Sequence, residues 1–149
     1  MSLKERLMDD LKTSMKEKQT LRKNTITMLR SRIKQYEVDN RLSADDELIM
    51  QMIQKEIKER NDTLEALAGS DRAELIDDTK LEIQYLSEYL PKQLSNEELA
   101  QIVDIIATEV NATSMKDMGN MMKVAKEKCG SRVDAKRLSE AVKAKLSSL

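Results

Sequence analysis

Apolar residues recur at intervals of three and four along almost the whole chain, which is the spacing of a helix with one buried face. The pattern predicts a first helix at roughly 2–18 and a second at roughly 20–39. The second helix is expected to bury four residues: Ile26, Leu29, Ile33 and Tyr36. Because each helix keeps a polar face for solvent, we expect these segments to pack as a long helical hairpin or bundle.

Helix-stop signals divide the next stretch into two further helices. Ser43 is expected to cap a third helix that runs to about Ala68, with Gly69 as its C-cap. The fourth helix is expected at about 71–89, with one apolar side made of Leu75, Ile76, Ile83 and Leu86. Pro91 disfavours helix at the residue before it and therefore marks a break.

The last third of the chain has clear helix-start signals. Ser95 followed by Glu98 forms a capping box, and Asp134 is placed to cap the final helix. We therefore expect an all-α protein with two parts. Residues 1–91 would form an N-terminal domain of about four helices, and residues 92–149 a small C-terminal three-helix domain.

Charge is distributed unevenly, although the formal net charge is only −1. Residues 1–38 carry ten Lys and Arg against five Asp and Glu, residues 39–95 carry seven against fourteen, and residues 111–149 carry nine against four. The two basic ends are suited to attract phosphate. The alternative is that both kinds of charge merely solvate ordinary helical faces.

Several classes of function are poorly supported by the sequence. There is no histidine, so the most common general base and metal ligand is missing, and the single cysteine, Cys129, cannot form an intramolecular disulfide. No glycine-rich phosphate loop occurs. We expect no catalytic residue, no metal and no cofactor. Without a signal-like segment or an apolar run of membrane-spanning length, we expect a cytoplasmic protein with no membrane partner.

Four charged residues fall within or beside the apolar stripes of the first four helices, and these are Arg22, Glu56, Arg60 and Glu82. Glu56 and Arg60 are four residues apart, so their side chains can pair on one helix. One interpretation is a polar site between helices. The other, which we favour, is a buried ion-pair network that fixes how the helices pack.

Lysine and arginine form stripes on solvent-facing positions of three predicted helices. Lys23, Arg30 and Lys34 share one side of the second helix. In the C-terminal part the candidate phosphate contacts are Lys116, Lys123, Arg132, Lys136 and Lys143, with Lys126 nearby and with Gly119 allowing close approach. Such contacts neutralise phosphate without reading base identity. All three tyrosines lie outside this region, which argues against stacking on unpaired bases.

A methionine stripe at Met115, Met118, Met121 and Met122 has two interpretations. Methionine adapts to different partners, so the stripe could be a docking surface, but we favour core packing. Cys129 extends the same face and is expected to be buried and inert.

Four segments of the chain resemble the GatB/YqeY family. They are residues 54–60, the Tyr-Leu-Pro-Lys-Gln-Leu-Ser hinge at 89–95, residues 117–119, and the turn containing Arg132, Asp134 and Lys136. The hinge is the most specific of them, and the resemblance covers nearly the whole chain. Ser131 and Ala135 stand where the family turn has glycines, which reduces the access of a phosphate to this loop.

The resemblance implies a small two-part helical protein similar to the tail of the B subunit of the glutamine-dependent tRNA amidotransferase, a carbon–nitrogen ligase. That tail helps to grip the tRNA body, while the active sites lie elsewhere in the complex. We therefore expect a monomeric, non-catalytic accessory module that binds tRNA, amidotransferase subunits or another protein. The alternative is a protein-interaction module, with no nucleic-acid role, that docks through a hydrophobic groove between its two parts.

Overall fold

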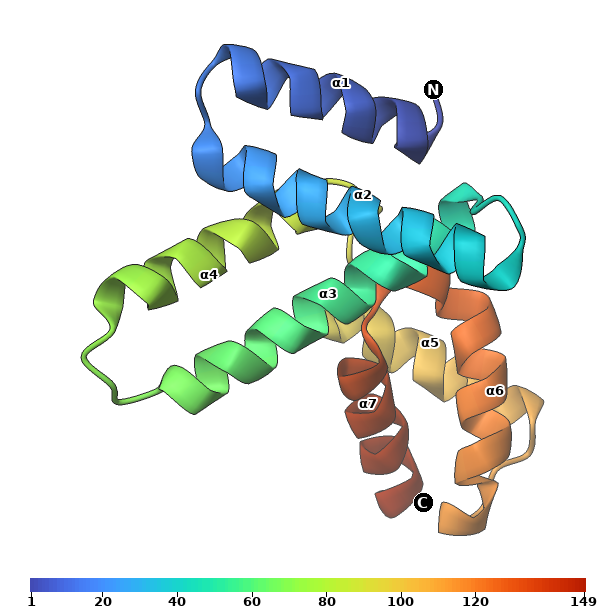
Figure 1. Ribbon diagram of the computed structural model, residues 1–149. Coiled ribbons are helices and arrows are strands. Elements are labelled where there is room, and N and C mark those ends of the chain that lie inside the picture. Colours follow the sequence, from blue (N-terminus) through green and yellow to red (C-terminus); the bar gives the residue numbers. More distant parts are fainter. The chain divides into compact units, whose positions relative to one another are not determined.

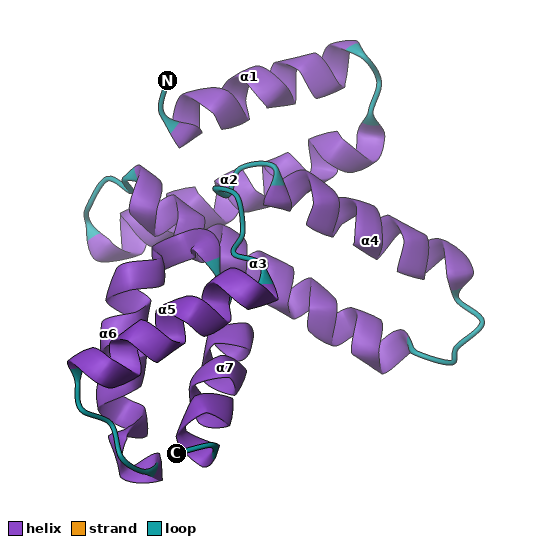
Figure 2. Cartoon of the chain, turned by 180° about the vertical axis from the view of Figure 1, so that it is seen from behind, coloured by secondary structure: helices purple, strands orange, loops and turns teal.

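The computed structural model describes residues 1–149 and confirms an all-α fold. It contains seven α-helices and two short 3₁₀ helices, and no β-strand (Figures 1 and 2). The chain divides into two compact units, an N-terminal unit at Met1–Leu90 and a C-terminal unit at Pro91–Leu149. None of the helices combines the length and the apolar character that crossing a membrane requires.

The N-terminal unit consists of two helical hairpins (Figure 1). Its helices are α1 (Leu3–Lys16), α2 (Thr20–Asn40), α3 (Asp46–Leu67) and α4 (Ala73–Ser87). The central helix α2 contacts α1, α3 and α4. Their apolar faces meet in one core that includes Leu7, Ile26, Leu29, Ile49, Ile53 and Leu86. Burial of these stripes away from water is what holds the unit together.

The predicted N-cap of α3 is wrong by two residues. The Asp45 side chain caps the helix by accepting a hydrogen bond from the Leu48 N–H at 2.9 Å. The Ser43 hydroxyl instead accepts from the Lys4 ammonium at 2.9 Å. Asp45 directly precedes the first helical residue, and a cap side chain reaches the free first-turn amides only from that position.

Two residues expected in the core are exposed instead. Tyr36 is 36 % exposed, because Glu37 continues the inner side of α2 and receives the Lys4 ammonium and the Ala44 N–H. Leu75 is 42 % exposed. It lies at the loop end of the α3–α4 hairpin, where residues 68–75 are all exposed, so no neighbouring element covers it.

Tyr89 fastens the end of the N-terminal unit to α1. Its hydroxyl donates to the Asp10 carboxylate, and the Arg6 guanidinium lies 5.0 Å from the centre of its ring. Burial, and then the hydrogen bond to Asp10, raise the pKa of the Tyr89 phenol well above its ordinary value. Beside it, the Arg22 guanidinium lies over the Tyr85 ring and bonds to the Glu88 carboxylate at 3.2 Å, which ties α2 to the same end of α4.

Replacing Tyr89 by phenylalanine is expected to lower the free energy of unfolding by about 2 kcal/mol, because it removes a buried hydrogen bond to a charged carboxylate and leaves the ring in place. Tyr36→Phe is the matched control, since no hydrogen bond is recorded for the Tyr36 hydroxyl on its more exposed ring, and it should change stability by less than about 0.5 kcal/mol. Urea denaturation followed by circular dichroism measures both. Equal effects of the two substitutions would contradict the anchoring role of Tyr89.

The C-terminal unit is a three-helix module made of α5 (Asn96–Glu109), α6 (Met118–Cys129) and α7 (Ala135–Ser147). Short 3₁₀ turns, η1 (Met115–Asp117) and η2 (Gly130–Arg132), precede and follow α6. The capping predictions are confirmed: Ser95 and Glu98 form a capping box on α5, and the Asp134 carboxylate accepts from the Arg137 N–H. The core contains Leu99, Val103, Ile106, Met121, Ala125, Leu138 and Val142.

The methionine stripe is divided between core and surface. Met121 is fully buried, Met118 and Met122 are partly buried, and Met115 is 45 % exposed. Cys129 is buried in the same core, and burial raises the pKa of its thiol. The predicted burial of Cys129 is confirmed, and its low reactivity, which a raised pKa favours, stays a prediction.

Candidate nucleic-acid interface

The lysines singled out in the C-terminal unit lie on the outward sides of two neighbouring helices. Lys116 and Lys123 are exposed on η1 and α6, and Lys136 and Lys143 are exposed on α7. The opposite sides of α6 and α7 carry core residues such as Met121 and Leu138. The apolar stripes that make these helices pack therefore also direct the lysines away from the core.

Two other lysines of these helices are neutralised by the acidic helix α5. The Lys128 ammonium lies 2.8 Å from the Glu109 carboxylate, and the Lys145 ammonium lies 3.0 Å from that of Asp104. These pairs bind α6 and α7 to α5. In contrast, no carboxylate lies within ion-pairing distance of four remaining lysines of this region, Lys116, Lys123, Lys126 and Lys143. Their charge is available to a partner.

Arg132 is used differently from the lysines. Its half-buried guanidinium donates to the Lys128 carbonyl at 2.9 Å and to the Cys129 carbonyl at 3.3 Å. These are carbonyls at the C-terminus of α6, which have no partner within the helix. Arg132 therefore caps α6. The sequence signal for this role is an arginine placed just after the glycine that ends a helix.

Two of the segments quoted for the family resemblance lie against each other. The Leu94 N–H donates to the Arg132 carbonyl at 2.8 Å, and the Gln93 side-chain amide donates to the Ser131 carbonyl at 2.9 Å. The Arg137 guanidinium returns a bond to the Leu94 carbonyl at 2.8 Å. The hinge and the turn before α7 are thus joined by one bond between main chains, and the Gln93 and Arg137 side chains add bonds to main-chain carbonyls. Arg137 was not identified from the sequence as part of this junction.

The first turn of α7 contains two cationic residues. Lys136 and Arg137 follow the Asp134 cap, and no acidic side chain belongs to that turn. Positive side chains at a helix N-terminus are disfavoured by the helix dipole, at a cost of roughly 0.3–1 kcal/mol each at the surface. The Asp134 carboxylate offsets that cost, because it accepts from the Arg137 N–H in the same turn.

Gly119 lies on the exposed side of α6 near Lys116 and Lys123. A β-carbon added at this position would meet no atom within 4 Å. Packing within the chain therefore does not explain the glycine. Its predicted role, allowing the backbone of a ligand to approach, stays a prediction.

The polar residues of the N-terminal unit form a closed network. The Glu56 side chain is almost fully buried and receives the guanidinium of Arg60 at 2.6 Å and that of Arg32 at 2.5 Å. Arg60 also donates to the Glu82 carboxylate at 2.8 Å. The structure thus joins Glu56, Arg60 and Glu82 and adds Arg32, while Arg22 lies apart with Glu88.

This network links α2, α3 and α4 through ion pairs between its own charged groups. No buried side-chain nitrogen or oxygen lacks a hydrogen-bond partner. No group of three or more Cys, Asp or Glu side chains is arranged to hold a metal ion. A carboxylate fully occupied by two guanidinium groups is suited to fixing the packing of helices rather than to binding a ligand.

The sequence was compared with models of known protein families, and one of them matches. The model of the YqeY-like proteins matches residues 4–146, which is nearly the whole length. The chain belongs to the YqeY-like family. A search of the curated proteins finds no match. The match to the YqeY-like family includes residues of both structural units. It therefore includes the hinge and the turn that bond to each other in the C-terminal unit.

Proposed function

We propose that this YqeY-like protein is a non-catalytic accessory module that acts in the cytoplasm and binds the phosphate backbone of tRNA through α6 and α7. The observation that supports it is the set of four lysines that no carboxylate neutralises, Lys116, Lys123, Lys126 and Lys143. Cations left without an internal partner create a positive surface, and such a surface attracts a polyanion. Lys136, also predicted as a phosphate contact, is exposed in the first turn of α7.

The expected mode of contact follows from what the C-terminal unit lacks. All three tyrosines lie in the N-terminal unit, and the chain has no tryptophan or phenylalanine. Proteins that bind unpaired bases stack them on exposed aromatic rings. Contacts to phosphate and to the shape of an RNA helix remain available. The choice of tRNA among structured RNAs comes from the resemblance to the amidotransferase tail, and amidotransferase subunits are therefore proposed as protein partners.

Binding to tRNA is expected to weaken steeply as salt rises. Four phosphate contacts predict that the logarithm of the association constant falls by about 3.6 per tenfold increase in salt, or about fiftyfold in affinity between 50 and 150 mM. Fluorescence anisotropy with labelled total tRNA at several salt concentrations measures the slope. A duplex RNA of similar length is the control for shape. Absence of binding at low salt, or binding insensitive to salt, would overturn the proposal.

A further inference from the structure

A groove runs along one side of the α1–α2 hairpin in the N-terminal unit. One wall is a face of α1 and the other is a flank of α2, and the two helices run in opposite directions (Figure 1). Two hollows of this α1–α2 groove are lined by Lys4, Glu5, Met8 and Met15 of α1 and by Lys23, Arg30, Lys34 and Glu37 of α2. Leu11 and Thr27 fall between the hollows, and the sets Lys4, Met8, Leu11, Met15 and Lys23, Thr27, Arg30, Lys34 recur every three or four positions, so each set lies in line along its helix.

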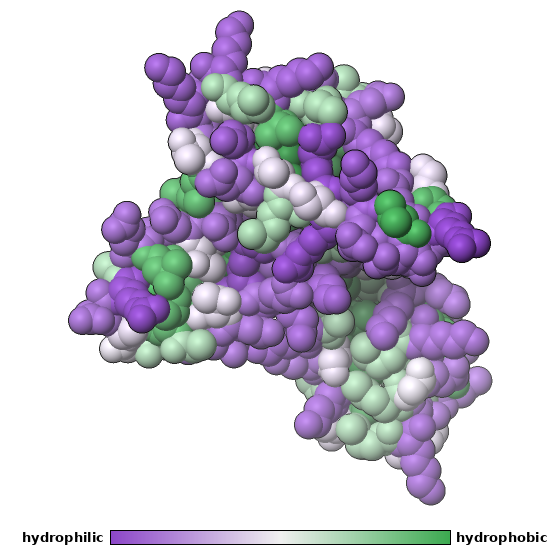
Figure 3. All heavy atoms as spheres, viewed as in Figure 1, coloured by the Kyte–Doolittle hydropathy of each residue, from purple (hydrophilic) through white to green (hydrophobic).

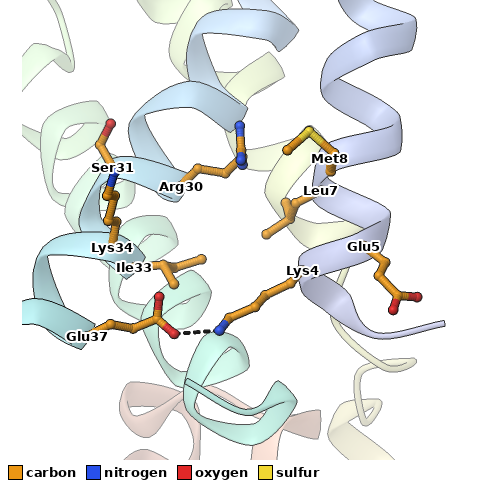
Figure 4. A pocket seen from close by; sticks show the side chains of 9 residues that line it. All are labelled: Lys4, Glu5, Leu7, Met8, Arg30, Ser31, Ile33, Lys34 and Glu37. Atoms are coloured by element: carbon orange, nitrogen blue, oxygen red, sulfur yellow. Dashed lines mark hydrogen bonds and ion pairs between the residues drawn. The ribbon is translucent and has the colours of Figure 1, made fainter. Parts of the chain in front are cut away.

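At one end of the groove a hollow of about 530 Å³ lies between the two helices. The buried side chains of Leu7 and Ile33 lie at its base. Figure 4 shows the Arg30 side chain reaching from α2 toward Leu7 and Met8 on α1. A second, smaller hollow at the other end is lined by Met15 and Lys23 among others. Space is therefore present at both ends of the same surface.

From Met8 to Met15 the wall formed by α1 is apolar. Met8 is 36 % exposed and Met15 is 59 % exposed, with half-buried Leu11 between them. Figure 3 shows green side chains over α1 and between α1 and α2, among purple ones. Unbranched methionine side chains fit themselves to differently shaped partners, and they are frequent on surfaces that bind amphipathic helices. A partner that covers exposed apolar side chains removes them from water, and this favours its binding.

The wall formed by α2 is positively charged. Lys23, Arg30 and Lys34 have no carboxylate within ion-pairing distance, although the protein as a whole is slightly acidic. At one end of the groove Lys4 is paired with Glu37 and adds no free charge. An occupant that complements both walls must present an apolar stripe to α1 and carboxylates to α2.

We propose that the α1–α2 groove binds an acidic amphipathic helix of a partner protein. A helix of about 14 residues, roughly 21 Å long, matches the length of α1. Its apolar positions at i, i+3, i+4 and i+7 cover Met8, Leu11 and Met15, and its carboxylates meet the α2 cations. A phosphate backbone would pair with the cations but leave the methionines in water, which is why a peptide fits better. This proposal is independent of tRNA binding by α6 and α7.

The test uses a fluorescein-labelled synthetic 14-residue peptide with a leucine stripe flanked by glutamates. We expect saturable binding by anisotropy to the full-length protein, and no comparable binding of a peptide with lysines in place of the glutamates. A scrambled peptide of the same composition should bind at least about tenfold more weakly. In protein labelled on its methionine methyl groups, nuclear magnetic resonance should show shifts of Met8 and Met15, while buried Met121 in the C-terminal unit stays unchanged.

Charge reversal on α2 provides the residue-level test. Arg30→Glu with Lys34→Glu should weaken peptide binding by about tenfold or more. Lys55→Glu with Lys80→Glu makes the same change in net charge at exposed positions of α3 and α4, and should change the affinity less than about twofold. Equal effects of the two pairs, or equal binding of the scrambled peptide, would overturn the proposal. So would shifts of Met8 and Met15 on adding tRNA, because the groove would then be an RNA surface.

Discussion

Replacing Glu56 by alanine is expected to lower the free energy of unfolding of the N-terminal unit by about 3 kcal/mol. The Glu56 carboxylate is buried and receives guanidinium groups from Arg32 on α2 and Arg60 on α3. Its removal leaves the mostly buried Arg60 with Glu82 as its only carboxylate partner. Removing one member of a buried ion pair is costly because the remaining charge keeps its desolvation penalty and loses its partner.

Glu59 offers a control on the same helix and with the same arginine. Its carboxylate lies 2.9 Å from the Arg32 guanidinium, but its side chain is 44 % exposed. Glu59→Ala should therefore cost less than about 1 kcal/mol, as is typical of surface ion pairs. Tyrosine fluorescence during urea denaturation reports on the N-terminal unit alone, because all three tyrosines lie in it. If the two substitutions cost the same, the buried network does not stabilise this unit in the way described.

Features set by neighbouring residues were predictable from the sequence. The capping box of Ser95 and Glu98 and the Asp134 cap depend only on side chains reaching amides two or three residues away. The same holds for the pairing of Glu56 with Arg60, since positions four apart meet on one helix. Together with the helical period of the apolar residues, such local signals were enough to predict an all-α fold.

Features set by contacts between distant segments were not predictable. Arg32 on α2 pairs with Glu56 on α3. The residues beside Arg32 in the sequence do not distinguish it from an arginine that faces solvent. The bonds from Arg132 to the carbonyls at the end of α6 were not foreseen from its place in the loop between the last two helices, while its role as a phosphate contact stays a prediction. Tyr36 follows the apolar period of α2, yet the tertiary contact with Lys4 gives the inner position to Glu37.

The C-terminal unit contains residues that hold its segments together and residues that stay at its surface. Gln93, Leu94 and Arg132 are engaged in hydrogen bonds between the hinge and the turn, and so they explain how the start of the unit is fastened to α6 and α7. Gly130, between α6 and η2, has a φ of +54°, which a residue with a β-carbon rarely adopts. The candidate phosphate contacts are lysines that take no part in these hydrogen bonds and lie at the surface of the unit.

Reversing three of those lysines should have the largest effect on tRNA binding. Lys116→Glu, Lys123→Glu and Lys143→Glu together are expected to weaken binding more than about a hundredfold at 50 mM salt, since each replaces an attraction to phosphate by a repulsion. The matched control reverses Lys12, Lys55 and Lys80, which are exposed in the N-terminal unit and likewise lack a carboxylate partner. That triple variant has the same net charge and should bind within about threefold of the parent protein.

The salt dependence distinguishes lost contacts from a damaged fold. Changing the same three lysines to glutamine should reduce the slope of log affinity against log salt by about 2.7, because each lost phosphate contact removes about 0.9. Misfolding would lower the amount of active protein and leave the slope of the remainder unchanged. A glutamine variant with the parent slope would show that Lys116, Lys123 and Lys143 do not contact phosphate, and equal losses in the two charge-reversed proteins would show that only the net charge matters.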